Sequence, residues 1–370
     1  MKKVFRILLI ALSVFIGFII YVNPIIKKYY MGKYYRENYK SEDMQTQTIG
    51  SYPSSFRIND IPHISNKKAY CQPTALQMIS EKYGIREDIG YFNFLMGFSY
   101  GSFYRSDFEI FSFFEDPVQG FRSACPYLGL KMKCLTANDS AAFLNSARFY
   151  LSKGLPVIVE LDAGTLWGET VFLPHSEVLI GYNEKGFEYF ETGKEDSYKA
   201  AAMGIMLEDD VLVRSVARFT KEFMNPWKFM ILVFEKSGKK TADLKEAWRK
   251  NGNLLIGKKG WLAASGSCAI ELFAQKFKKS IKVRDISMLE PSVYTRADNA
   301  LFLQKYFKRD KEAAPAAKSL AEASGLYRQV IELIKTGEEE KRGEVAGLLQ
   351  KTALLERSTG EIFLKKTVDK

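Results

Sequence analysis

The sequence is poor in the residues that bind transition metals and carry acid–base chemistry near neutral pH. Its 370 residues include only two histidines, His63 and His175, and four cysteines. The cysteines are Cys71, Cys125, Cys134 and Cys268. No Cys-x-x-Cys pair occurs, and two histidines cannot complete the ligand spacing of a zinc finger. We therefore expect no metal site and no cofactor. Cys125 and Cys134 are expected to pack as thiols, although a disulfide between them stays open.

Features typical of nucleic-acid binding are also missing. The formal net charge of +11 is concentrated near the two ends of the chain, in residues 1–60 and 241–370. Arginine and aromatic residues are not interleaved there in the manner of a nucleic-acid surface. Most of this charge is interpreted as a solvated face, and the basic N-terminal region also suits an anionic membrane or wall-polymer surface. We expect no nucleic-acid partner, and the oligomeric state is left open.

In the stretch from Ala69 to Gly84, an extended segment is followed by a short predicted helix. Cys71 lies at the junction between the two. Apolar residues fall on one face of that helix: Ala75, Met78, Ile79 and Tyr83. Pro73 is tolerated in the first turn, and Gly84 is a suitable stop. Cys71 then lies at a helix N-terminus, where free backbone N–H groups and the helix dipole favour a thiolate. The pattern favours a nucleophile, and the alternative is a small buried apolar residue.

Of the two histidines, His175 has the better setting for a base. It begins a predicted strand, residues 176–182, which a turn at residues 183–186 connects to a return strand ending at Glu191. Such a hairpin holds an imidazole rigidly and brings a carboxylate near it. We predict that Glu191 orients His175, with Glu188 on the other face of the strand. His63 lies in a loop-like run and is interpreted as a surface residue.

These blocks occur in the order found in papain-like cysteine peptidases. The helix start Cys71-Gln72-Pro73-Thr74-Ala75, the strand Leu155–Val159 and the hairpin from His175 to Glu191 resemble the group related to the bacteriocin leader peptidases. The stretches Phe94–Gly101 and Val159–Asp162 also resemble the N-terminal domain of the butirosin biosynthesis protein H family, an acyltransferase relative on the same fold. Farther along, Tyr294–Arg296 and Asn299–Leu303 resemble the helical companion domain of that family. The resemblance covers about residues 60–235. It implies that Cys71 is the nucleophile, His175 the base and Glu191 the orienting acid.

Two departures from the family pattern concern the oxyanion site. Gln72 stands where the peptidases usually have glycine, and no glutamine lies in the few residues before Cys71. Asn66 is the nearest upstream amide. We therefore assign Asn66 and Gln72, together with the backbone N–H of Cys71, as oxyanion donors. The third member of the set is also a glutamate rather than the aspartate of the family.

The N-terminus predicts a membrane anchor. Residues 7–22 carry no charge and follow three basic residues, and the apolar segment 4–26 approaches the ~20 residues that cross a bilayer. No small-residue cleavage site follows, which favours an uncleaved signal anchor over a removed signal peptide. Several lysines after the segment weaken the orientation signal. We expect a single-pass protein of a bacterial cell membrane, with its catalytic domain outside the cytoplasm.

The predicted fold class is α+β: a papain-like domain, then an all-α helical domain, with one N-terminal transmembrane helix. We divide the chain into an anchor (1–26), a juxtamembrane spacer (27–59), a catalytic domain (60–236) and a helical domain (241–370). Eleven aromatic residues crowd into residues 91–114, which predicts core packing with one or two rings lining a cleft. The apolar run 229–234 predicts a buried strand that closes the sheet.

Three functions stay open. The first is a thiol peptidase or amidase that cleaves a peptide or amide bond through a Cys–His pair. The second is an acyltransferase that moves an acyl group from a thioester to an amine, as in the butirosin group. The third is a binding or scaffold protein that keeps the fold without turnover, which the unusual Gln72 favours. The expected partners are the membrane, through residues 4–26, and a peptide or small acyl substrate.

Overall fold

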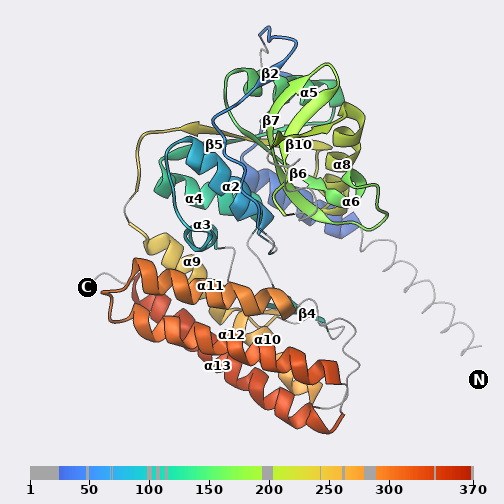
Figure 1. Ribbon diagram of the computed structural model, residues 1–370. Coiled ribbons are helices and arrows are strands. Elements are labelled where there is room, and N and C mark those ends of the chain that lie inside the picture. Colours follow the sequence, from blue (N-terminus) through green and yellow to red (C-terminus); the bar gives the residue numbers. More distant parts are fainter. Residues whose placement is uncertain are drawn as a thin grey trace, which may run out of the picture. The chain divides into compact units, whose positions relative to one another are not determined.

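The protein is described by a computed structural model, shown as a ribbon in Figure 1. The described residues are 25–46, 50–66, 68, 70–97, 102–105, 109–112, 116–193, 203–241, 243–260, 263–278, 289–336 and 339–367. No helix in these ranges is long and apolar enough to cross a membrane. Of the predicted anchor, residues 1–24 lie outside the described part, so the anchor stays a prediction.

The chain divides into two compact units. The first comprises Met1–Ile58, Lys133–Phe190 and Gly204–Val233, and the second comprises Asn59–Met132, Glu191–Met203 and Phe234–Lys370. The second unit contains the predicted helical domain, 241–370, and both units contain parts of the predicted catalytic domain, 60–236. The four predicted sets of domain bounds stay predictions.

A mixed β-sheet organises the first unit. Its strand order is β1-β5-β10-β6-β7-β8-β9, with β2 paired to β7, and β1 runs parallel to β5. The strands are β1 (Glu42–Asp43), β2 (Phe56–Arg57), β5 (Leu130–Ala137), β6 (Val157–Asp162), β7 (Pro174–Asn183), β8 (Gly186–Phe190), β9 (Ile205–Leu207) and β10 (Phe229–Lys236). The predicted strands near Leu155–Val159 and after His175 are thereby confirmed, as is the hairpin that β7 and β8 form.

The position of β10 differs from its prediction. We expected residues 229–234 to close the sheet, but β10 lies between β5 and β6 in the strand order. Residues 229–234 are all buried. A continuous apolar run is what a strand needs when both of its faces are covered, and an interior strand meets that condition.

The first unit also contains several helices. They are α5 (Ser140–Ser152), α6 (Ala163–Leu166) and α8 (Asp209–Glu222), and residues 25–39 are also helical. The helix at 25–39 falls largely within the predicted spacer, and its Tyr35 and Tyr39 are buried against Trp227. The Tyr35 hydroxyl donates to the backbone oxygen of Phe223 at 2.8 Å. This part of the spacer is therefore folded onto the first unit.

The second unit is mostly helical. Its helices are α2 (Cys71–Lys82), α3 (Ile89–Met96), α4 (Pro117–Leu128), α9 (Lys245–Ile256), α10 (Gly266–Phe277), α11 (Glu290–Tyr306), α12 (Ala313–Thr336) and α13 (Arg342–Lys365). A small antiparallel sheet has the order β11-β3-β4, from β3 (Ser102–Arg105), β4 (Glu109–Ser112) and β11 (Ala263–Ser265). The short turns η1 (Met44–Thr46), in the first unit, and η3 (Glu339–Lys341), in the second, complete the named elements.

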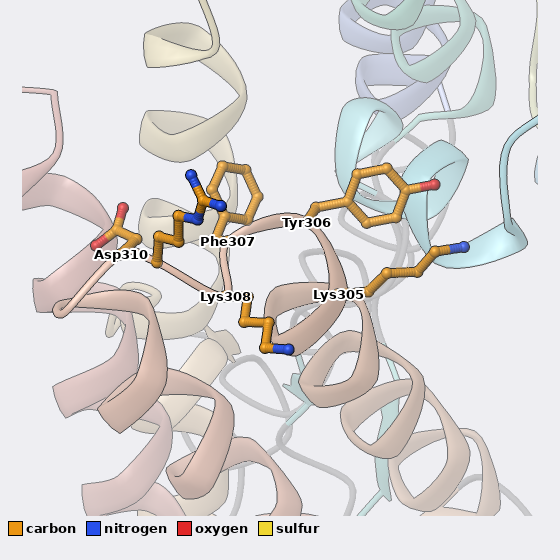
Figure 2. A pocket seen from close by; sticks show the side chains of 6 residues that line it. Lys305, Tyr306, Phe307, Lys308 and Asp310 are labelled. Carbon is orange, nitrogen blue, oxygen red and sulfur yellow. The ribbon is translucent and has the colours of Figure 1, made fainter.

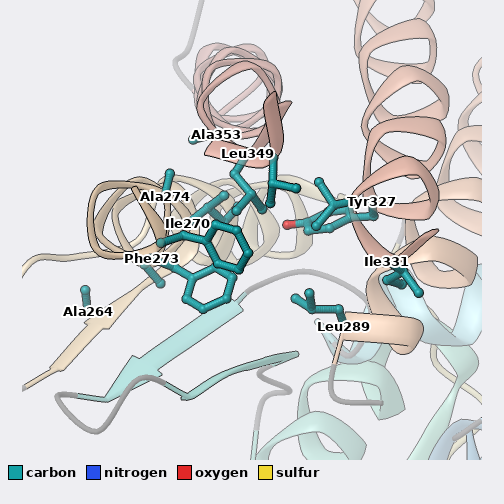
Figure 3. Close-up of a cluster of buried hydrophobic side chains, with 13 residues drawn as sticks. Ala264, Ile270, Phe273, Ala274, Leu289, Tyr327, Ile331, Leu349 and Ala353 are labelled. Carbon is teal, nitrogen blue, oxygen red and sulfur yellow. The ribbon is translucent and has the colours of Figure 1, made fainter. Parts of the chain in front are cut away.

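The apolar stripes predicted in the C-terminal region form a core. Side chains from α10, α12 and α13 meet there, as Figure 3 shows for Phe273, Tyr327 and Leu349. All three are fully buried. Residues 91–96 add a second aromatic cluster, in which Phe94 contacts Trp248 of α9 at a ring-centroid distance of 4.7 Å. Those aromatic residues of the crowded stretch 91–114 whose side chains are described, Tyr91, Phe92 and Phe94, thus contribute to packing.

A buried ion pair connects three helices of the second unit. The guanidinium of Arg296 on α11 donates two hydrogen bonds to the carboxylate of Glu356 on α13, at 2.7 and 3.0 Å. The hydroxyl of Tyr327 on α12 donates to the same carboxylate at 3.0 Å. Arg296 and Glu356 are 1% and 0% exposed. Each charge is therefore stabilised by its partner rather than by water, because both groups are buried.

Removing one member of this pair should destabilise the fold strongly. We expect Glu356→Gln to lower the free energy of unfolding by about 3–5 kcal/mol, because it leaves the Arg296 charge buried without a counter-charge. The control is Glu290→Gln, which removes the exposed partner of Lys335 between α11 and α12 and should cost less than about 1 kcal/mol. Urea unfolding followed by circular dichroism measures both, and equal effects would contradict the prediction.

Candidate active site

Cys71 is the first residue of α2, as predicted. Tyr70 occupies the N-cap position, Pro73 lies in the first turn, and Gly84 follows the helix with a φ of +80°. A positive φ costs a glycine little, which explains this residue at the helix end. The Cys71 side chain is partly exposed. Cys71 therefore lies, partly exposed, at the end of the helix where backbone N–H groups lack internal partners.

The side chain next to the thiol is Gln72. The Cys71 Sγ–H donates to Oε1 of Gln72 at 2.9 Å, and Gln72 is 9% exposed. The amide carbonyl thus faces the sulfur in this arrangement. A 180° rotation of the amide group would instead turn its two N–H donors toward the same place, as an oxyanion donor requires. The oxyanion role of Gln72 stays a prediction.

In the second unit, the segment 63–66 is hydrogen-bonded to residues 191–192, which brings Asn66 near Glu191. The backbone N–H of Asn66 donates to the oxygen of Thr192 at 3.0 Å, and Nε2 of His63 lies 3.0 Å from the backbone oxygen of Glu191. The Asn66 side-chain oxygen accepts the backbone N–H of Lys68 at 3.2 Å. Asparagine side chains commonly accept the backbone N–H two residues on in this way, and here the bond occupies the Asn66 side-chain oxygen.

Glu191 is buried although it is an acid. Its carboxylate accepts the backbone N–H of Gly193 at 2.9 Å, and the residue is 1% exposed. It follows directly after β8, where the ladder with β7 ends at the pair Val178–Phe190. Glu188, which alternation placed on the other face of the strand, forms an ion pair with Arg57. The placement of Glu188 and Glu191 on opposite faces stays a prediction.

His175 lies in the first unit, near the start of β7. Its Nε2 is 3.1 Å from Oε1 of Glu177, whose side chain is 0% exposed. The ring of Trp167 makes an edge-to-face contact with the imidazole at a centroid distance of 5.8 Å. A buried carboxylate and an aromatic ring therefore restrict the imidazole. Sequence reasoning passed over Glu177, although residues two apart on a strand share a face.

Asp162 holds the loop that carries Trp167. This buried carboxylate accepts the backbone N–H groups of Gly164 and Thr165 at the start of α6, and that of Leu173 just before β7. Arg218 lies 2.9 Å from the same group. Burial alone raises the pKa of Asp162, but the hydrogen bonds from Thr165 and Leu173, with the charge of Arg218, hold it below its ordinary value. The carboxylate thus ties both ends of the loop.

The predicted site residues are divided between the two units. Cys71, Gln72, Asn66 and Glu191 belong to the second unit, whereas His175 belongs to the first. The structure brings Asn66 and Glu191 together through their adjoining segments and places Gln72 against Cys71. The pairing of Cys71 with His175 stays a prediction, as does the orienting role of Glu191.

A surface pocket elsewhere in the second unit shares none of these residues. It lies at the end of α11 and the turn that follows, with a volume of about 530 Å³ (Figure 2). Its lining residues are Lys305, Tyr306, Phe307, Lys308, Arg309 and Asp310. Lys305 and Asp310 already form ion pairs with Asp88 and Lys366. The pocket therefore contains no nucleophile and no base of the predicted site.

One comparison with known proteins matches part of the chain. Residues 58–203 match the model of the Peptidase_C39 like family, a stretch that includes all five predicted site residues. The match confirms the resemblance to the papain-like cysteine peptidase superfamily. The mixed α+β architecture, with a sheet and many helices, fits a papain-like domain together with a helical part. No curated protein matches the chain.

The exposures of the thiols predict selective alkylation. At about pH 8, where accessible thiols are alkylated, iodoacetamide should modify the partly exposed Cys71 and leave the buried Cys125 intact. Burial raises the pKa of the Cys125 thiol to about 12, so its thiolate is rare in the folded protein. The stability from keeping this thiol neutral is present below the pKa of the unfolded thiol, and it is lost as the pH rises toward 12.

Peptide mass spectrometry measures this selectivity. The control is the chain in urea, where all four cysteines should react. Modification of Cys125 in the folded chain at the rate of Cys71 would contradict the prediction.

Proposed function

We propose that the protein is a papain-like thiol enzyme that cleaves a peptide or amide bond through acyl transfer to Cys71. The observation that carries the proposal is the family match over residues 58–203, which spans a partly exposed thiol at the start of a helix. The half-buried His175 with its adjacent carboxylate supports it further. Together these are the nucleophile and the base that such chemistry needs.

The reaction has two stages. His175 takes the thiol proton and the Cys71 sulfur attacks the carbonyl carbon, forming a C–S bond and an oxyanion. Asn66, Gln72 and the backbone N–H of Cys71 are the proposed donors to that oxyanion. The C–N bond then breaks, and the imidazolium returns its proton to the leaving amine. Water, deprotonated by His175, attacks the thioester, releases the acid and restores the thiol.

Two glutamates are candidates for orienting the imidazole. The family resemblance implies Glu191, because it stands at the end of the hairpin, where the resembling peptidases have their acid. Glu177 has a described contact with His175 at 3.1 Å. A buried carboxylate stabilises the imidazolium that forms when the thiol proton is taken. We assign the orienting role to Glu191, and Glu177 provides a direct comparison.

The acyl acceptor distinguishes a peptidase or amidase, which uses water, from an acyltransferase, which uses an amine. The predicted extracytoplasmic location favours water, because carrier-bound acyl donors are cytoplasmic. The helical part after the papain-like domain favours an amine acceptor, since it resembles the companion domain of the butirosin group. The hydrogen bond from Cys71 to Gln72 is the feature that suits a scaffold without turnover, because it engages the thiol.

The proposed setting is a bacterial cell membrane. The apolar segment 4–26 would anchor the chain as a single span, and the enzyme would act on a peptide or small acyl substrate outside the cytoplasm. The exposed side chains of Ile25, Tyr29 and Tyr30 support a position close to a lipid surface. Aromatic residues are enriched at that depth of a membrane. No nucleic-acid partner is proposed.

Acylation by p-nitrophenyl acetate tests the nucleophile and the base. We expect a burst of p-nitrophenol with an acetyl group on Cys71, no adduct at that position with Cys71→Ser, and a rate lower by about 10²–10⁴ with His175→Ala. The fate of the adduct, with and without an added primary amine, distinguishes hydrolase from transferase. An unreactive Cys71 in the folded wild type would favour the scaffold.

Matched substitutions compare the two acids. We expect Glu191→Gln to lower the acylation rate by about 10–100-fold, because the imidazolium loses its counter-charge and its fixed orientation. Glu177→Gln is the control and should lower it less. Steady-state rates measured at equal folded fractions decide between them, and the reverse order would transfer the orienting role to Glu177.

A further inference from the structure

One face of α11 packs against the segment that leads into α2 and against α3. The residues on that face recur every four positions: Tyr294, Asp298, Phe302 and Tyr306. The four-residue step brings them above one another on a helix. Phe302 and Tyr306 contact Tyr91 of α3, at ring-centroid distances of 6.2 and 5.3 Å. This face therefore ends, at Tyr294 and Asp298, beside the residues before Cys71.

Asp298 binds two of those residues. The Nζ of Lys68 donates to both of its carboxylate oxygens, at 2.9 and 2.7 Å. The hydroxyl of Tyr70 donates to the same carboxylate at 3.0 Å. Burial raises the pKa of Tyr70 and the charge of Asp298 raises it further, so the phenol keeps the proton that it donates. Three side chains from two elements thus form one charge-assisted network.

Tyr70 transmits this restraint to the thiol. It is 0% exposed, and its ring makes an edge-to-face contact with Tyr294 at 5.5 Å. Its backbone oxygen accepts the N–H of Thr74 at 2.9 Å, which is the first hydrogen bond of α2. A residue that is held at its ring, its hydroxyl and its carbonyl has little freedom. Because Cys71 follows it directly, the direction of the thiol depends on Tyr70.

Contacts on the face of α11 opposite to Tyr294 and Asp298 also fix the position of this helix. Arg296 lies about 200° around the helix from Tyr294, since each residue turns ~100°, and it is fixed by Glu356. On the near face, a Cβ at Gly90 of α3 would lie 3.0 Å from the Cβ of Phe302. A side chain at this position would push α11 away by a few tenths of an ångström, so the close approach favours glycine. The helix is therefore held on both sides.

We propose that Asp298 is a positioning residue, through which the helical part of the chain holds Tyr70 and so directs the Cys71 thiol for attack. The inference rests on the proposed function of Cys71. Apolar packing alone would secure α11 without a charged network beside the nucleophile. Misplacement of a reacting atom by about 1 Å can cost 10²-fold in rate. The helical part is then a component of the site rather than an appended domain.

The test measures acylation of Cys71 by p-nitrophenyl acetate in the full chain. We expect Asp298→Asn to lower the maximal rate about tenfold or more, with KM unchanged within about twofold and an unaltered melting temperature. Tyr70→Phe, which removes only the hydroxyl, should lower the rate in the same direction. The control is Lys305→Gln, which removes an exposed ion pair from the same helix and should leave the rate unchanged.

The outcomes separate this inference from the proposed function. If the wild type forms no adduct that depends on Cys71, the proposed function fails and the inference with it. If the wild type acylates and both Asp298→Asn and Tyr70→Phe match it, only the inference fails. A rate loss that merely follows a loss of folded protein would also overturn it. If Asp298→Asn does not fold, Tyr70→Phe decides alone.

Discussion

The buried ion pair between Arg296 and Glu356 is the constraint on which the second unit depends. Two parallel hydrogen bonds between a guanidinium and a carboxylate, with water excluded, leave the two groups few alternative arrangements. A rotation of α11 would separate the charges at high cost. The pair therefore sets which face of α11 meets the core with α12 and α13, and which face is left for the segment before Cys71.

The first unit has a comparable concentration of buried charge around His175. Asp162, Glu160 and Glu177 all lie on β6 and β7 and are at most 1% exposed. Each has a polar contact: Arg218 and backbone N–H groups for Asp162, the Ser176 hydroxyl at 2.6 Å for Glu160, and the His175 imidazole at 3.1 Å for Glu177. Such contacts lower the cost of burying an acidic side chain. Asp162 holds the loop that carries Trp167, and Glu177 lies beside the imidazole.

Much of the local structure followed from the sequence. The helix that begins at Cys71 was predictable because its apolar spacing, its early proline and its final glycine all agree. The hairpin of β7 and β8 was predictable because two alternating segments flank a turn. The interior place of β10 was not, because strand order depends on which strands the chain brings together, and residue pattern reveals only how many faces are buried.

Of the candidate site, the sequence by itself determined the types of group and their settings: a thiol at the start of a helix, an imidazole on a strand and an acid after a hairpin. Those features depend on neighbours within a few residues, so local physics reveals them. Only the tertiary structure decided that Asp298, 227 positions after Cys71, accepts a hydrogen bond from Tyr70, the residue before the thiol. Contacts between distant segments arise from packing of whole elements, and no local pattern encodes them.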